Sequence, residues 1–514
     1  MLQLSREQIH HYFYIACLIT IAIAIPLSNY VMSMGGVFLL ANAVLQWDWQ
    51  EKWNRLKENK IALVFPLFYL IYCLGLIHTD NFSAAADALL NRLPIFLAPM
   101  IIATSALPTR REWRVVMHAY LGSVLFATIY SSVYYLTHEV ADIREISRFI
   151  SHIRFSLSVV FSIVLAASYL IQFWKSHKIF SILYLFLIFW LLCYLFVSQT
   201  LTGIMILFLL LLVLFLYLLF GWKDKKWKSL LITAMSILLA SFFAYFLIVT
   251  VDYFKGKEKE SERLLLTENG NSYYHDENSM IENGHKIYTY ISYDELPSAW
   301  SKRSLKPYAE VEATLIRYLN SLGLHKDSAG VAQLSDWDVQ NIENEIANVE
   351  YARKFGLRKN LYATFFSLSA YHHYRQVANS SLLQRVELWR NSWSLIKRNF
   401  WLGVGIGDHK QALDEELVKT DSPLKDTRNK GCHNQFLTIW LSSGFFAFLA
   451  LLAMLFVPFL FAKPKISLLY LLFFVILFTS MFTEDTLDTN AGVFLFSLFN
   501  ALLLFVYPKI GKSV

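Results

Sequence analysis

The sequence predicts an all-α polytopic membrane protein with about 12 transmembrane helices and a large, mainly helical loop between the ninth and tenth. Two observations indicate this fold class. The 514 residues are 56% hydrophobic and only 17% charged, whereas soluble domains carry about 25% charged residues. Uncharged apolar runs long enough to cross a hydrocarbon core about 30 Å thick recur along the chain. This composition excludes a water-soluble enzyme, a disordered chain and a collagen-like fibre.

The apolar runs form a group of nine spans and a group of three, separated by a long polar stretch. The first run, 12–46, is too long for one crossing, and Pro26 with the polar residues behind it predicts a turn between two helices. The other runs are 61–78, 93–107, 115–137, 155–173, 179–197, 203–220, 229–250, 435–461, 466–482 and 492–507. We therefore expect transmembrane helices 1–9 in residues 1–250, an outside domain in 251–434, and helices 10–12 in 435–514.

The basic residues of the short loops indicate how these helices are oriented, because Lys and Arg stay on the cytoplasmic side. One set of loops holds eighteen Lys and Arg residues, and the opposite set holds Arg92, Arg144, Arg148 and Arg154. Both termini are therefore expected in the cytoplasm, and 251–434 in the periplasm of a cell with two membranes. This topology explains the net charge of +7. No basic stripe interleaved with aromatic residues indicates nucleic-acid binding.

The outside segment is the only part long enough to form a domain in water. Its start, 255–300, lacks helical periodicity and is expected to be loop with short strands. Apolar residues at three- and four-residue steps predict a helix over 308–323. Ser335 has the character of an N-cap opening a second helix to about Arg353, and 382–399 predicts a third.

This third helix carries an arginine at the edge of its apolar face. At roughly 100° per residue, with Arg385 at zero, Ile396 falls near 20° and Trp389 near 40°. A guanidinium there needs an anion, because an unpaired buried charge costs several kcal/mol. The anion is either an acidic side chain, such as Glu387 or one from another helix, or a phosphate, which the planar five-donor fork suits.

The segment after that helix contains Gly403, Gly405 and Gly407. It does not fit a nucleotide-binding loop, because no strand precedes it and the third glycine of G-x-G-x-x-G is missing. We expect instead a helix stop and a tight turn, with Asp408 capping a short helix through Leu417.

A histidine follows immediately before the tenth span. His433 lies in Cys432-His433-Asn434-Gln435, and the span begins at Phe436. A lone histidine is usually a surface residue or one whose hydrogen bonds are satisfied. This one is placed at the outer membrane–water boundary, where a water-soluble group meets a lipid-borne one.

The order of these motifs resembles the O-antigen ligase and O-antigen polymerase family of multi-span bacterial glycosyltransferases. The motifs that carry the resemblance are Arg385 with Trp389, the glycine run from Phe400 to Gly407, His433-Asn434 with Phe436-Leu437, and Gly444 inside a span. The likeness includes twelve spans and a large outside loop, and so covers most of the chain. It implies a membrane glycosyltransferase-like fold and metal-independent transfer of glycan from an undecaprenyl-diphosphate carrier, with no cofactor.

Residue roles follow from the resemblance by position. His433 matches the catalytic histidine, and Arg385 matches the arginine that binds the donor diphosphate. A further arginine is expected near the outer end of an earlier span, where Arg154 is the first candidate and Arg148 the second. Many relatives carry Ser-Arg-x-Gly entering the eighth span, where this chain has Thr200-Leu201-Thr202-Gly203. Arg154 therefore either replaces the arginine missing at Leu201 or is a snorkelling side chain at the headgroup boundary.

The chemistry suits these residue types. A glycosyl diphosphate already has a good leaving group, so fixed arginines need only stabilise the charge on the departing phosphate. His433 has the pKa range of a base for the acceptor hydroxyl, and a single displacement inverts the anomeric centre. The outside loop lacks the spacing of a metal-ligand set, so no metal is expected. Glu484 and Asp485, in an acidic turn outside the last two spans, either orient the acceptor or the histidine, or form a solvated hairpin.

We therefore expect an O-antigen ligase-like glycosyltransferase of the inner membrane, acting in lipopolysaccharide biosynthesis. Its expected partners are an undecaprenyl-diphosphate-linked glycan donor, lipid A-core or another glycan acceptor, and membrane lipids. A polymerase or a protein O-glycan ligase of the same family would use the same donor, and both remain alternatives. A lipid-linked glycan transporter is the alternative from another class. Ion-coupled transport usually places ionisable groups within the membrane. The main such residue in the predicted spans is His118, which counts against a transporter.

Overall fold

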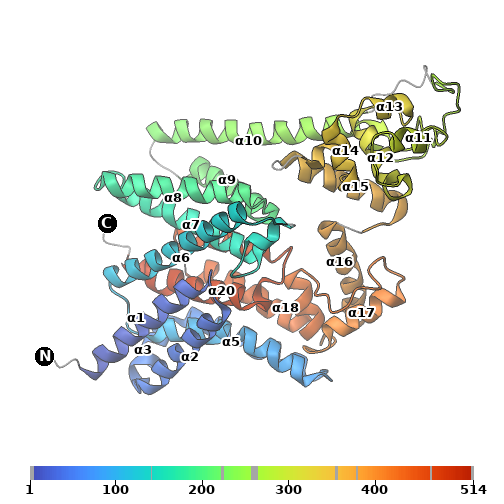
Figure 1. Ribbon diagram of the computed structural model, residues 1–514. Helices are drawn as coiled ribbons and strands as arrows, with labels where there is room; N and C mark the ends of the chain where they lie inside the picture. The colour runs from blue at the N-terminus through green and yellow to red at the C-terminus, as the bar shows by residue number, and fades with distance from the viewer. Residues whose placement is uncertain are drawn as a thin grey trace. The chain divides into compact units, whose positions relative to one another are not determined.

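The computed structural model describes residues 5–140, 142–221, 225–255, 264–352, 357–377, 380–462 and 466–510. Within these ranges the chain is almost entirely helical (Figure 1). The one sheet in this part of the chain has two antiparallel strands, β1 (Ile281–Glu282) and β2 (His285–Lys286). The expectation of an all-α polytopic membrane protein is confirmed.

Eight of the described helices are long and apolar enough to cross a membrane, and a ninth is counted if α2 (Asn29–Leu45) and α3 (Trp49–Glu58), bent by 111° at their junction, form one span. The eight are α5 (Phe82–Thr104), α6 (Arg110–Thr137), α7 (His152–Phe173), α8 (Lys178–Val197), α9 (Leu201–Gly221), α10 (Lys225–Phe254), α18 (Gln435–Phe461), and α20 (Asn490–Ala501) with its continuation to Ile510. Each remaining predicted run also coincides with helix: α1 (Arg6–Ala24), the shorter stretch Lys60–Leu76 that contains α4 (Val64–Tyr72), and α19 (Leu468–Ser480). The number of twelve crossings stays a prediction.

The contacts within the chain define two compact units, one of Met1–Tyr217 with Arg385–Val514 and one of Leu218–Gln384. The boundary at residue 385 falls inside the segment 251–434 that the sequence suggests as one outside domain. The last part of that segment, 385–434, therefore packs with the apolar helices of the first unit.

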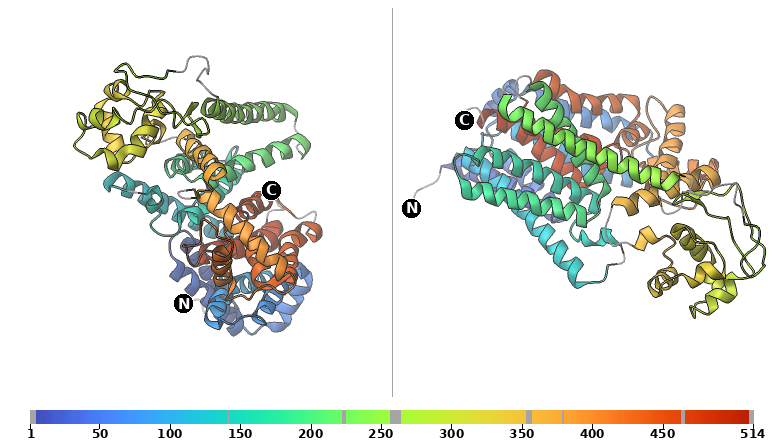
Figure 2. Two further views of the ribbon diagram at one scale, coloured as in Figure 1. Left: turned by 90° about the vertical axis from the view of Figure 1, so that its right-hand side faces the viewer. Right: turned by 90° about the horizontal axis from the view of Figure 1, so that it is seen from above.

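In the first unit, α20 is the central helix. It packs against α1, α2, α5, α7 and α19, and all of its residues from Ala491 to Ala501 are buried. Figure 2 shows the red C-terminal helices side by side with the blue N-terminal ones, which are far apart in the sequence. Because α20 is surrounded by protein, the turn that precedes it, between α19 and α20, also contacts other helices, among them α5 and α18.

The second unit has a hydrophobic core of its own, formed around Trp300 and the apolar face of α12. Its helices are α10, α11 (Leu296–Ser301), α12 (Tyr308–Leu322), α13 (Ser328–Ala332), α14 (Asp336–Glu343) and α15 (Leu357–Tyr374). Helix α12 agrees with the predicted range and ends at Gly323, which has a φ of 72°.

Two details of the second unit differ from the sequence prediction. Ser335 does cap α14, but this helix ends at Glu343 because the chain turns at Glu345, whose φ is 61°. The predicted end at Arg353 lies outside the described residues. Helix α15 has no counterpart in the prediction. The third predicted helix corresponds to α16 (Ser381–Arg398), and it is followed by α17 (His409–Lys419).

Candidate functional site

One buried carboxylate gathers side chains from three distant parts of the first unit. Glu484 lies in the turn between α19 and α20 and is only 2% exposed. Its Oε1 accepts a hydrogen bond of 2.5 Å from Nη2 of Arg385, and its Oε2 lies 3.2 Å from Nη2 of Arg154. Nδ1 of His433 is 3.7 Å from the same Oε2, a charge contact longer than a normal hydrogen bond. The acidic turn thus brings together three residues singled out from the sequence.

Each of these residues is presented by the start of a helix. Arg154 lies in the first turn of α7, Arg385 is the fifth residue of α16, and His433 lies two residues before α18. Arg148 lies apart from this group, because its exposed guanidinium stacks on the ring of Tyr134 at 4.6 Å. Of the two arginines considered for the second phosphate contact, only Arg154 pairs with Glu484.

The charges around Glu484 keep it ionised. Burial alone would raise the pKa of this carboxyl, but the His433 imidazole and the guanidinium groups of Arg154 and Arg385 outweigh burial and hold the pKa below its ordinary value. The single negative charge offsets one of the two arginines, so this group keeps an excess positive charge. The Nε atoms of Arg154 and Arg385 are buried and have no hydrogen-bond partner among the described residues.

The neighbouring carboxylate, Asp485, binds two backbone N–H groups and one side-chain hydroxyl. Its Oδ2 accepts from the His433 N–H at 3.1 Å, and its Oδ1 accepts from the Asn434 N–H at 3.1 Å and from Oγ1 of Thr438 at 2.6 Å. His433 has a φ of 50°, in the left-handed region that side chains other than glycine seldom adopt. Asp485 therefore fixes the strained backbone that presents the imidazole. Burial, together with the charge of Asp488, raises the pKa of Asp485 to about 6.

A second ion pair lies beneath this turn. Arg92 of α5 is buried, pairs with Asp488, and stacks on the ring of Tyr72 at 4.6 Å. Gln435 joins both sides, because its Nε2 donates to Asp488 at 2.8 Å and its Oε1 accepts from the Leu487 N–H at 2.6 Å. The first turn of α18 and the acidic turn are thereby held in one network.

The glycine turn contacts a break in α18. Gly403 and Gly405 have φ values of 74° and 108°, and Gly444, inside α18, has a φ of 79°. The Val404 N–H donates to the carbonyl of Leu441 at 2.8 Å. A Cβ added at Gly444 would lie 2.1 Å from the carbonyl oxygen of Trp401. The inserted turn therefore satisfies backbone groups that the break would leave unpaired within an apolar helix.

The role expected for Asp408 is wrong. Its carboxylate accepts from the N–H groups of Asp80 and Asn81, at 2.9 and 3.1 Å, at the start of α5. It makes no side-chain hydrogen bond to α17. Its own φ of −107° and ψ of −12° are helix-like, whereas a capping side chain needs extended backbone to reach the first N–H groups. Gly407 lies at the same junction, since a Cβ there would be 2.0 Å from the Asn81 carbonyl oxygen.

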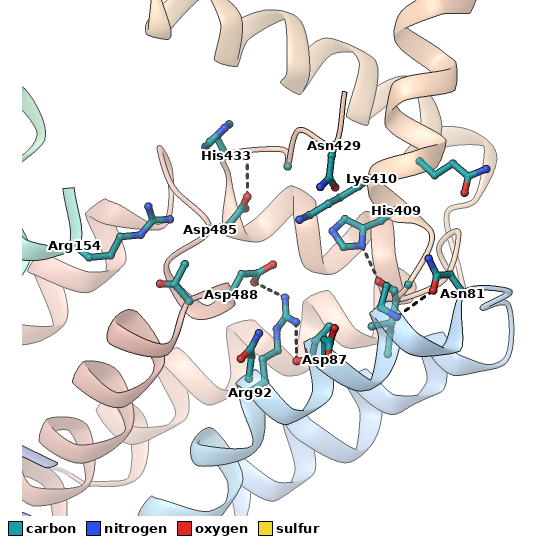
Figure 3. A pocket seen from close by; sticks show the side chains of 18 residues that line it. Asn81, Asp87, Arg92, Arg154, His409, Lys410, Asn429, His433, Asp485 and Asp488 are labelled. Carbon is teal, nitrogen blue, oxygen red and sulfur yellow. Dashed lines mark hydrogen bonds and ion pairs between the residues drawn. The ribbon is translucent and has the colours of Figure 1, made fainter. Parts of the chain in front are cut away.

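A cavity of about 520 Å³ opens beside these groups (Figure 3). Arg154, His433 and Asp485 line one end, and Asn81, His409 and Lys410 line the other, with Arg92 and Asp488 between them. Its volume lies within the usual range of ligand pockets. Among the described residues, no group of three or more His, Cys, Asp and Glu side chains is arranged to hold a metal ion.

Comparison with known families agrees with this geometry. Residues 346–452 match the family model described as O-antigen ligase. The chain carries an O-antigen ligase family domain. No curated protein matches the chain. The O-antigen ligase match contains Arg385, the glycine turn and His433 and extends into α18.

Three polar residues of this site have no role in the sequence analysis. Arg92 was counted only as an arginine of an outside loop, and its partner Asp488 only as part of an acidic turn. His409 appeared only as the residue after Asp408. The contacts of Arg92 connect α5 with the turn before α20, far apart in the chain, and no local pattern indicates such a pairing.

Proposed function

We propose that this protein is an O-antigen ligase-like glycosyltransferase that moves polysaccharide from undecaprenyl diphosphate to lipid A-core. The reaction takes place at the periplasmic face of the inner membrane by an inverting, metal-independent displacement. One observation carries the proposal: Arg154, Arg385 and His433 converge on Glu484 beside a cavity, in a chain with an O-antigen ligase family domain.

The two arginines bind the diphosphate of the glycan donor. Glu484 pairs with Nη2 of each guanidinium, and Nη1 of Arg154 donates to Oγ of Ser151 at 3.3 Å. The two buried Nε atoms and Nη1 of Arg385 are then left to donate to phosphate oxygens. Fixed donors of this kind stabilise charge that grows on the diphosphate as the bond from C1 to the phosphate oxygen breaks. The excess positive charge of this group favours a dianionic diphosphate over neutral ligands.

His433 acts as the base that takes the proton from the acceptor hydroxyl. With its Nδ1 proton directed at Glu484, the Nε2 lone pair is free to take a proton. The acceptor oxygen forms its bond to C1 as it loses this proton to Nε2, and the electron pair of the breaking bond leaves with the diphosphate. The contact to Glu484 stabilises the imidazolium that results, as a carboxylate does for a catalytic histidine.

Transfer between purified components tests this proposal. The full chain in lipid nanodiscs is mixed with undecaprenyl-diphosphate-linked polysaccharide and lipid A-core, and the product is followed by gel shift. We expect His433→Ala to lower kcat by about 10²- to 10⁴-fold, the usual contribution of a general base. Arg148→Ala is the matched control and should keep the wild-type rate. Full activity of His433→Ala would remove the proposed base.

Deletion of the gene separates the alternatives. Loss of long-chain lipopolysaccharide with accumulation of carrier-linked polymer supports a ligase, whereas persistence of single-repeat products supports a polymerase. Transfer of the glycan to a periplasmic protein supports a protein O-glycan ligase. Accumulation of unflipped donor in the cytoplasm supports a transporter.

Reporter fusions test the proposed orientation, with cytoplasmic termini and residues 251–434 in the periplasm. Alkaline phosphatase is active only outside the cytoplasm, so we expect activity when it is fused at Asn271 and none at Lys226. The reverse pattern would invert the topology and place the site on the wrong face for a periplasmic reaction.

A further inference from the structure

At the end of the cavity away from Arg154, a buried imidazole has one nitrogen without a partner. His409 is 6% exposed, and its Nδ1 lies 2.8 Å from the carbonyl oxygen of Ile406. Because a carbonyl only accepts, we assign the ring hydrogen to Nδ1. Burial lowers the pKa of His409 and keeps the ring neutral, so Nε2 carries a lone pair. This Nε2 is buried and has no hydrogen-bond partner among the described residues.

The groups around His409 differ from those around His433. Nε of Arg92 is also buried without a partner in the described part of the chain. Asp87 and Asn91, one turn apart on α5, line the same cavity, and Figure 3 shows Asp87 beside Arg92. Lys410 lines this end as well, but an anion in contact with Nε2 would be repelled by its lone pair, and an apolar ligand would leave the buried polar atoms unsatisfied. A hydroxyl group fits, because it both donates and accepts.

We propose that this end of the cavity is a binding subsite for a sugar ring of the carbohydrate substrate. In it, a sugar hydroxyl donates to Nε2 of His409, and Nε of Arg92 donates to a sugar oxygen. The inference rests on the proposed function and extends it, because it states where the glycan binds relative to His433. Both histidines line one cavity, so the ring held at His409 belongs either to the acceptor or to the first sugar of the donor.

A matched substitution isolates the Nε2 atom. In His409→Asn, the amide nitrogen still donates to the Ile406 carbonyl, but no atom takes the place of Nε2. Substrate titrations in nanodiscs, with undecaprenyl-diphosphate-linked polysaccharide and lipid A-core varied in turn, should show an increase of about tenfold in one KM with kcat within about twofold. An increase for lipid A-core assigns the subsite to the acceptor, and an increase for the carrier-linked donor assigns it to the donor sugar. Unchanged KM values for both substrates, or a loss confined to kcat, would overturn the proposal.

Two further measurements keep the result interpretable. Asn91→Ala, which alters the cavity wall next to Arg92 on α5, should raise the same KM by a smaller factor, and it serves if His409→Asn fails to fold. Calorimetric binding of delipidated core oligosaccharide, and of glycan released from the donor, needs no turnover. If the wild type binds one glycan with an affinity that drops about tenfold in His409→Asn but transfers nothing, the subsite stands and the ligase function fails. If transfer proceeds and the affinities for both glycans are equal in wild type and variant, the subsite fails and the function stands.

Discussion

The two carboxylates of one turn, Glu484 and Asp485, do opposite things at the same site. Glu484 faces side chains: it pairs with Arg385 and Arg154, and its pKa lies below the ordinary value. Asp485 faces backbone: it accepts the N–H groups of His433 and Asn434, and burial raises its pKa to about 6. Two adjacent carboxylates therefore have different roles. Glu484 positions the two arginines, and Asp485 positions the backbone of His433.

Among the variants that test this division, the largest effect is expected from the arginines that pair with Glu484. Arg385→Ala removes the guanidinium that pairs with Glu484 and donates to the diphosphate in our proposal. Loss of one such fixed donor costs about 10²- to 10³-fold in kcat. Arg148→Ala removes an arginine of equal charge that stacks on Tyr134 away from Glu484, and its kcat should stay within about twofold of wild type. The nanodisc transfer assay measures both. Equal losses in the two variants would mean that general positive charge matters, and not the pairing at Glu484.

Glu484→Gln tests whether the charge of the carboxylate is needed. The amide keeps the size of the side chain but leaves two guanidinium groups near a neutral partner, so their mutual repulsion disorders both. We expect kcat to fall by about 10²-fold, because misplaced donors lose most of their effect. A variant with wild-type kcat and a lower donor KM would show that Glu484 competes with phosphate and does not position the arginines.

Asp485→Asn tests the backbone side and should have a smaller effect. The amide retains one oxygen for the N–H groups of the His433 segment but presents an NH₂ group to one of them. We expect kcat to fall by about tenfold with the donor KM unchanged, because the imidazole is displaced while the arginines remain in place. Donor and acceptor titrations distinguish this result from a loss of phosphate binding, which would raise the donor KM.

The opposite pKa shifts predict opposite contributions to stability as the pH changes. Because the folded-state pKa of Glu484 is depressed, its stabilising effect is present above its unfolded value of about 4.5 and is lost as the pH falls. Asp485 binds its proton more strongly in the folded state, so its contribution falls as the pH rises from about 4 to about 6. Thermal unfolding in detergent, followed by tryptophan fluorescence, should show a decrease of Tm over this interval in the wild type that is smaller in Asp485→Asn. Parallel curves for the two proteins would contradict the raised pKa.

Much of the fold could be predicted because the apolar runs are long and uninterrupted. All of them coincide with helix, and α12 and α16 were located from apolar spacing alone. The position of Arg385 on its helix also showed that its guanidinium needs an anion. Its partner, Glu484, lies in the turn between α19 and α20, whereas the sequence analysis named Glu387 or an acidic residue of another helix. Sequence spacing carries no information on such a long-range pairing.

The arginine missing at Leu201 illustrates a different limit. Leu201 begins α9, and a Cβ added at Gly203 would lie 3.1 Å from Cβ of Ser156. The start of α9 therefore packs close to the start of α7, two residues beyond Arg154. The replacement of the missing arginine by Arg154 stays a prediction. The sequence shows that the arginine is missing at Leu201, but it does not show that α9 lies beside α7.

The insertion of the glycine turn into the break of α18 has a practical consequence for producing the protein. Val404 and Gly405 donate to the carbonyls of Leu441 and Ser442, and Phe445 donates back to Phe400. A recombinant fragment that stops before α18 would lose these contacts. Crystallisation or antibody work on residues 385–434 therefore requires a polypeptide that retains α18.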